Sequence, residues 1–91
     1  MHTQEIVVNS SAGLCSRAAT YFIETAKQYR SRIWVKKDEC VVDAKSLLGI
    51  LSLCVKKETP ITLIANGQDE KEAIDALLDL IISMNENHCH L

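Results

Sequence analysis

Apolar and polar positions follow one another along the chain with a changing period, which predicts strands and helices in turn. Residues 5–8, EIVV, are β-branched and precede the polar loop NSSAG, a pattern typical of a first strand. From Arg17 the period lengthens to that of an amphipathic helix, which we expect to end near Tyr29. The apolar positions of this helix are Ala19, Phe22, Ile23 and Ala26.

The middle of the chain predicts a hairpin followed by an apolar helical segment. RIWVKK (32–37) and CVVDA (40–44) flank the pair Asp38–Glu39, which has the length of a two-residue turn. The next stretch, SLLGILSLCV (46–55), is too apolar for a fully exposed helix.

The last third of the chain predicts one strand and one helix. In PITLIANG (60–67), Ile61, Leu63 and Ala65 alternate on one face, and Pro60 suits the first position of a strand. Asp69 with Glu72 three residues later resembles a capping box, which would open the final helix. The apolar stripe of that helix is Ile74, Leu77, Leu78 and Ile81.

The predicted order is βαββαβα, which indicates an α+β fold. We expect an open-faced β-sandwich, in which a four-stranded, mostly antiparallel sheet is covered on one face by three helices. The opposite face would carry residues such as Trp34, exposed singly. With 91 residues and no linker, repeat or low-complexity segment, we expect residues 1–91 to form a single domain.

Composition narrows the classes of function. The net charge of −2 argues against direct binding of nucleic acid, which normally requires a basic face. No apolar run approaches the roughly 20 residues of a membrane span, so we expect no membrane insertion. The first residues, MHTQEIVV, lack the features of a signal peptide, which favours a cytoplasmic protein.

The cysteines and histidines do not predict a metal site or a cofactor. Cys15, Cys40, Cys54 and Cys89 are too far apart for a CxxC pair, so we expect reduced thiols, with Cys40 and Cys54 shielded. In the terminal NHCHL, the neighbouring residues His88, Cys89 and His90 lack zinc-site spacing. A site completed by His2 is the less favoured alternative.

The stretch SAGLCSRAAT (11–20) carries the first candidate chemistry. A small, glycine-containing loop runs into the predicted helix, with Cys15 and Arg17 at the junction. Backbone N–H groups at a helix start, together with a guanidinium, stabilise an anion. The same surroundings would lower the pKa of the Cys15 thiol and make it the most reactive of the four cysteines.

Three segments resemble HPr, the small phosphocarrier of the bacterial sugar phosphotransferase system. GLCSRAAT is similar to the active-site signature Gly-Leu/Ile-His-x-Arg-Pro-Ala, AKSLLGILSLCV to the signature around a regulatory serine, and ITLIANGQDEKEAIDAL to the last strand and helix. The segments occur in the family's order and cover nearly the whole chain. The resemblance implies the HPr fold and a role as carrier or regulator, without catalytic turnover.

The active-site signature departs from the family at two positions. Cys15 stands where the family has its phosphorylated histidine, and Ala18 stands where it has proline, whereas Arg17 matches. In the family, an upstream Enzyme I phosphorylates the histidine, which passes the phosphoryl group to sugar-specific components. The resemblance therefore makes Cys15 and Arg17 the active-site positions, although a thiol does not reproduce the reach of an imidazole.

The second signature is preserved better. The resemblance makes Ser46 the regulatory phosphorylation site of an HPr kinase/phosphorylase, and implies docking through the first two helices, in some relatives to a catabolite-control transcriptional regulator. From the residues alone, the Ser46 hydroxyl can also cap the following helix. That helix is too uniformly apolar to be buried entirely. The implied partner-binding residues are Ala12, Ser16, Thr20, Glu24, Leu47, Leu48, Leu51 and Ser52.

Two functions remain open on the sequence. The first is a regulatory adaptor of the HPr type that is controlled at Ser46 and has no phosphohistidine relay. The second is a thiol-based protein in which Cys15 accepts a phosphoryl group or is oxidised reversibly. A Cys15 without chemistry is a further alternative, because a thiol at a helix start need not be reactive.

Overall fold

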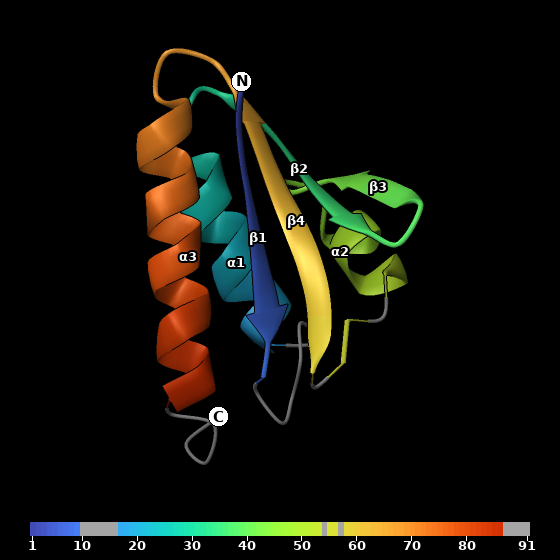
Figure 1. The fold of residues 1–91 in the computed structure, drawn as a ribbon. Coiled ribbons are helices and arrows are strands. Elements are labelled where there is room, and N and C mark those ends of the chain that lie inside the picture. The colour runs from blue at the N-terminus through green and yellow to red at the C-terminus, as the bar shows by residue number, and fades with distance from the viewer. Residues whose placement is uncertain (10–16, 54, 57, 87–91) are drawn as a thin grey trace.

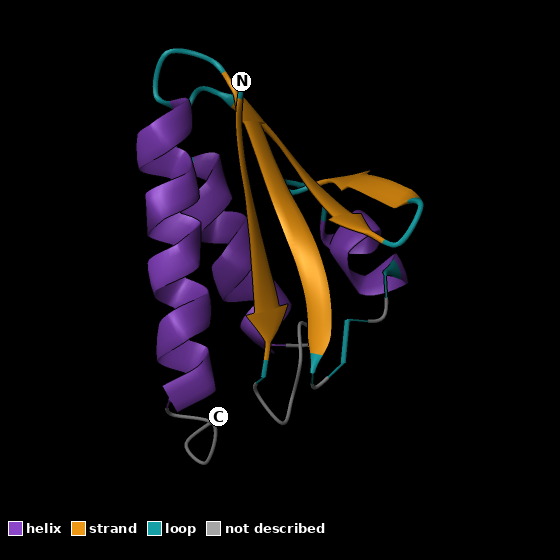
Figure 2. Ribbon diagram, in the orientation of Figure 1, coloured by secondary structure: helices purple, strands orange, loops and turns teal. Residues whose placement is uncertain are grey.

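The computed structural model describes residues 1–9, 17–53, 55, 56 and 58–86, and the predicted order βαββαβα is confirmed (Figure 2). The elements are β1 (His2–Val8), α1 (Arg17–Lys27), β2 (Arg32–Lys37), β3 (Cys40–Asp43), α2 (Leu47–Ser52), β4 (Thr59–Asn66) and α3 (Glu70–Glu86).

The four strands form one sheet in the order β1-β4-β2-β3, and every neighbouring pair is antiparallel. The last strand in the sequence, β4, is therefore central and lies between β1 and β2 (Figure 1). Its register places Ile61 opposite Ile6 of β1, and Leu63 opposite Val35 of β2. Pro60 is the second residue of β4 and lies beyond the β2–β4 pairing, which ends at Thr62, so its missing N–H costs no bond to β2.

One face of the sheet is buried beneath the three helices. The helices contribute Phe22 from α1, Ile50 from α2 and Ile74 from α3, all with fully buried side chains. The strands meet them with alternate residues, as expected for a sheet with one covered face. These strand residues are Val8, Ile33, Val35, Ile61, Leu63 and Ala65. The expected open-faced β-sandwich is thus the observed fold.

Two element boundaries differ from the sequence prediction. We expected β1 to start at Glu5, but it starts at His2, because pairing with β4 runs along its whole length from His2–Ala65 to Val8–Thr59. α1 ends at Lys27, two residues before Tyr29. The N–H groups of Gln28 and Tyr29 donate to carbonyls three residues earlier, so the chain continues as a tighter turn.

The β2–β3 hairpin turns at Asp38–Glu39 as predicted, with Asp38 in the left-handed region at a φ of 56°. One expectation about this hairpin was wrong: Cys40 is exposed rather than shielded, because β3 is an edge strand of the sheet. Trp34 lies on the open face as expected, where it is half-buried, with Asp43 and Ile64 directly opposite it on the two neighbouring strands.

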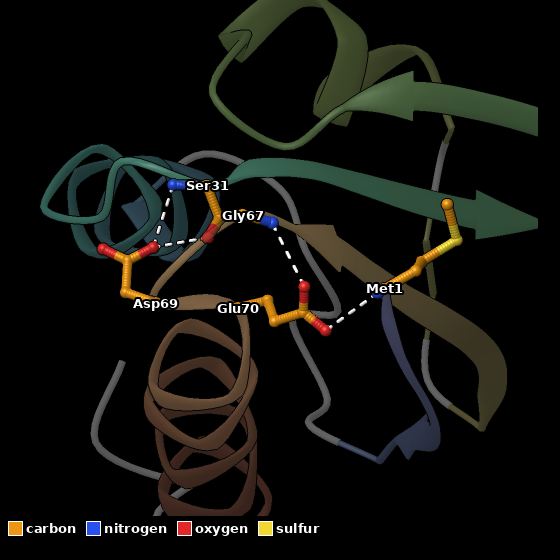
Figure 3. A network of polar contacts seen from close by, with 5 residues as sticks. All are labelled: Met1, Ser31, Gly67, Asp69 and Glu70. Carbon is orange, nitrogen blue, oxygen red and sulfur yellow. Dashed lines mark hydrogen bonds and ion pairs between the residues drawn. The ribbon is translucent and has the colours of Figure 1, made fainter.

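The start of α3 is built differently from the predicted capping box (Figure 3). The Asp69 carboxylate accepts hydrogen bonds from the backbone N–H groups of Arg30 and Ser31, each at 2.9 Å, and from the Ser31 hydroxyl. It therefore ties α3 to the connection between α1 and β2. Bonds to Ser31 and Arg30 lower the pKa of Asp69 from 3.8 to about 2.

The neighbouring carboxylate, Glu70, closes the other side of this junction. Its Oε1 accepts a hydrogen bond from the Gly67 N–H at 3.2 Å, and its Oε2 lies 3.0 Å from the amino group of Met1 (Figure 3). The bond from the amino terminus, with that from Gly67, lowers the pKa of Glu70. Together Asp69 and Glu70 tie the start of α3 to the amino terminus before β1, to the residue after β4 and to the α1–β2 connection.

The Asp69 contacts predict a specific loss of stability in acid. A carboxylate whose pKa is lowered by folding stabilises the fold above its unfolded-state pKa of about 4 and loses that contribution as the pH falls towards about 2. We expect Asp69→Asn to lower the urea midpoint at pH 7 and to flatten its decline between these two pH values. The exposed Asp75→Asn, a change in the same helix, should decline like wild type. Parallel profiles for Asp69→Asn and wild type would contradict this account.

Gly67 leaves no space for a side chain. A Cβ atom there would lie 2.5 Å from Ser31 Oγ and 2.7 Å from Ser31 Cα, and Asp69 holds Ser31 in place. We expect Gly67→Ala to destabilise the domain by about 1–3 kcal/mol, as overpacking does elsewhere. Thermal unfolding should show this loss, and the exposed neighbouring change Gln68→Ala should leave the melting temperature within error. An unchanged melting temperature of Gly67→Ala would mean that Ser31 can move to make room for the Cβ atom.

Candidate functional site

The first residues of α1 anchor the described end of the predicted active-site loop. Arg17 begins the helix and is exposed, whereas Ala18 and Ala19 are buried in the core. The helix start is thus held by two small side chains, with its cation facing solvent. The other predicted residues of this loop, Ala12, Cys15 and Ser16, lie outside the described residues.

The opposite end of that loop is fixed by α3. The Asn9 N–H, directly after β1, donates to Asn85 Oδ1 at 2.7 Å, and Asn85 Nδ2 donates to the Val7 carbonyl at 3.1 Å. One amide side chain near the end of α3 therefore satisfies two backbone groups where the chain leaves the sheet. Sequence reasoning missed Asn85, because a lone amide in a helix pattern gives no signal of a contact 76 residues away.

Ser46 is the N-cap of α2, as predicted. Its backbone is extended, with φ −107° and ψ 117°, and its side-chain oxygen accepts a hydrogen bond from the Gly49 N–H at 3.1 Å. The Ser46 N–H donates to the Asp43 carbonyl at 3.1 Å. Ser46 as a residue is half-buried, so it lies at the edge of the surface as well as capping the helix.

The short helix α2 divides its apolar residues between core and surface, as expected from its composition. Ile50 is fully buried, and Leu53, directly after the helix, is 5% exposed. By contrast Leu48 is 81% exposed, Leu47 45% and Leu51 37%. Ser52, also exposed, donates its hydroxyl to the Gly49 carbonyl at 2.7 Å. The surface next to Ser46 is therefore apolar.

A shallow groove of about 180 Å³ brings residues of α1 and α2 together. Of the predicted partner-binding residues, Thr20, Glu24 and Leu47 line this groove; Leu48, Leu51 and Ser52 do not. Sequence reasoning missed two lining residues, Ile23 and Lys27. Their helical spacing from Thr20 was a usable signal, but Ile23 was assigned only to the core.

The described residues add little to the predicted thiol and metal chemistry. Cys54, Cys89 and the histidines of the C-terminal tail lie outside them, as does Cys15. Within the described ranges, no group of three or more His, Cys, Asp or Glu side chains could hold a metal ion. In the same ranges, no helix has the length and apolar character needed to cross a membrane.

Comparison with known proteins gives a consistent result for the whole domain. Residues 2–83 match the family model described as the PTS HPr component phosphorylation site. The phosphocarrier protein HPr of Neisseria meningitidis serogroup A is 42% identical over 81 residues, covering 89% of this chain and 91% of that protein. The HPr-like protein Crh of Bacillus subtilis is 40% identical over 77 residues, covering 85% and 91%. Neither relative is an enzyme, in agreement with the prediction.

Solved structures show the same similarity. The crystal structure of HPr-C-His from Thermoanaerobacter tengcongensis superposes with a TM-score of 0.92 at 44% identity, covering 96% of this chain and 98% of that one. The solution structure of Bacillus subtilis Crh, there called the catabolite repression HPr, gives a TM-score of 0.67 at 38% identity, covering 88% and 95%. The fold, the family model and the relatives agree, and the chain belongs to the HPr family of the bacterial phosphotransferase system.

Proposed function

We propose that this chain is a regulatory member of the HPr family that is controlled by phosphorylation of Ser46 and does not relay phosphoryl groups through a histidine. The observation that carries the proposal is Cys15, which stands in the sequence where the family signature has the phosphorylated histidine. The similarity to Crh, an HPr-like protein associated with catabolite repression, supports it.

The chemistry of a thiol disfavours the ordinary relay. An imidazole nitrogen is nucleophilic at neutral pH and lies one bond further from Cβ than a cysteine sulfur. Replacement by Cys15 would retract the acceptor by about 1 Å, and displacements of this size can cost on the order of 100-fold in rate. Arg17 could still stabilise an anion at the helix start, so the substitution alters the acceptor more than its surroundings.

Ser46 is suited to be a switch, because its hydroxyl lies at the start of α2 and beside exposed leucines. A phosphate adds about −1.5 to −2 charges and three acceptor oxygens. Negative charge is tolerated at a helix start, where backbone N–H groups lack partners within the helix. Phosphorylation would thus preserve the fold while placing an anion beside Leu47 and Leu48.

The α1–α2 face is the docking surface in this proposal. Leu47, Leu48 and Leu51 offer apolar contact, and the groove beside them is rimmed by Glu24 and Lys27, which supply opposite charges. The proposed partners are an HPr kinase/phosphorylase, Enzyme I-like and sugar-specific phosphotransferase components, and a catabolite-control transcriptional regulator. Ala12, Ser16, Thr20 and Ser52 belong to the same proposed surface.

The first test concerns the phosphoryl relay. We expect phosphoenolpyruvate and Enzyme I to leave the wild-type protein essentially unphosphorylated in intact-mass measurements, and Cys15→His to restore at least part of the acceptance. Ala18 should limit the recovery, since proline at the first turn fixes the helix entry. Adding Arg17→Gln to the Cys15→His variant should abolish the restored phosphoryl acceptance. Rapid formation of a stable thiol-linked phosphate on wild type would favour the alternative function through Cys15.

The second test concerns Ser46 and its surface. Incubation with an HPr kinase/phosphorylase and ATP should add one phosphate to wild type and none to Ser46→Ala, which should also lose about 0.5–2 kcal/mol of stability with the cap. Leu48→Asp should lower the initial rate of phosphorylation about tenfold without changing the melting temperature, as expected for an exposed contact residue.

Ile82→Asp is the matched control for the docking surface. Ile82 is 46% exposed on α3 and is not among the described residues that line the α1–α2 groove, so its substitution should leave the phosphorylation rate unchanged. Equal effects of Leu48→Asp and Ile82→Asp would contradict the assigned surface. Phosphorylation of Ser46→Ala would place the modification at another residue.

A further inference from the structure

A second hollow lies apart from the α1–α2 face, beside the open side of the sheet. It has a volume of about 290 Å³ and is lined by Arg32, Ile33, Trp34, Asp43 and Lys45. None of these residues lines the groove between α1 and α2. The volume is at the lower limit for small-molecule sites, so it suits a ligand of one ring rather than a dinucleotide.

The strand register brings the polar groups of this hollow around the indole. Arg32 and Trp34 are two residues apart in β2, and Asp43 of β3 is directly opposite Trp34, so the three side chains share the open face. Trp34 itself is half-buried. An aromatic ring thus lies between a guanidinium on its own strand and a carboxylate on the next.

The charged side chains around the ring retain donors and acceptors that a ligand could use. Among the described residues, the exposed Arg32 guanidinium has no hydrogen bond or ion pair. The Lys45 amine donates to the Tyr29 carbonyl at 2.7 Å, which fixes it in place and leaves two of its three donors. Asp43 Oδ1 accepts from the Lys45 N–H at 2.8 Å, and its other oxygen remains an acceptor.

We propose that this hollow binds a small phosphomonoester that carries hydroxyl groups on a ring, which is the chemistry of a sugar phosphate. The C–H face of such a ring packs on the Trp34 indole, and a ring hydroxyl donates to Asp43. The phosphate is held by Arg32, whose planar donors match its oxygens, with Lys45 as a second cation. Asp43 disfavours ligands that are anionic and have no hydroxyl group to donate, because the Asp43 carboxylate would then face a second anion.

Binding can be measured directly because Trp34 is the only tryptophan in the chain. Glucose 6-phosphate is the probe, with glucose, inorganic phosphate and adenosine monophosphate as comparisons at constant ionic strength. We expect a saturable change in tryptophan fluorescence with glucose 6-phosphate at up to millimolar concentration, and at least tenfold weaker responses to glucose and to phosphate. Backbone amide shifts in the nuclear magnetic resonance spectrum of the wild-type protein should be confined to residues 32–34 and 43–45.

Two substitutions of the same kind test the assigned contacts. Arg32→Gln should weaken binding of glucose 6-phosphate about tenfold or more, the usual scale for loss of a charged hydrogen-bond partner. Lys36→Gln removes a cation from the same strand and the same face, outside the hollow, and should change the affinity less than twofold. Both variants should melt at the wild-type temperature.

Several results would overturn the proposal. These are no saturable response to glucose 6-phosphate, amide shifts centred elsewhere, or equal losses in Arg32→Gln and Lys36→Gln. An equal response to inorganic phosphate would show an anion site without ring recognition, and tighter binding of adenosine monophosphate would show a base-stacking site. Neither is the site proposed here.

Discussion

The pairing of β4 with both β1 and β2 is the interaction on which the rest of the structure depends. β4 is the last strand in the sequence, yet it occupies the centre of the sheet, and Ile61, Leu63 and Ala65 are buried along it. The central strand begins only at residue 59, so its contacts with β1 and β2 are non-local. The entropic cost of closing the intervening loops must be overcome before these contacts can stabilise the sheet. Once β4 is in place, α3 packs on β1 and β4, and α1 packs on α3 and α2.

The sequence predicted the features that depend on local periodicity and missed those that depend on distant partners. The inward positions of β4, the hairpin turn at Asp38–Glu39 and the cap at Ser46 follow from residues close in sequence, and all three were predicted. The first residues of β1 have weak strand character, and only their pairing with β4 makes them a strand. Asp69 was assigned to its own helix, whereas its carboxylate bonds to Arg30 and Ser31, 38 or more residues away.

The candidate site also has features that local sequence predicts and features that depend on distant partners. The exposure of Leu47, Leu48 and Leu51 was predictable, because six helical residues cannot bury that many large side chains on one side. The groove with α1 was not predictable in detail, because it requires the packing of two helices that are separated by a hairpin. The hollow around Trp34 was missed for a related reason. Its residues come from β2, β3 and the turn after them, and only the strand register brings them together.

The bonds of Asn85 to Asn9 and Val7 have a consequence for how this protein family can diversify. The described ends of the segment 10–16 are held from outside it, one by the Asn85 amide and the other by the buried Ala18 and Ala19 at the start of α1. The groups that make these contacts all lie outside the segment, so a change of side chain at position 15 leaves those groups themselves unaltered. Members of the family can therefore differ in the chemical group at position 15, imidazole or thiol, while they share the fold and the surfaces that it presents.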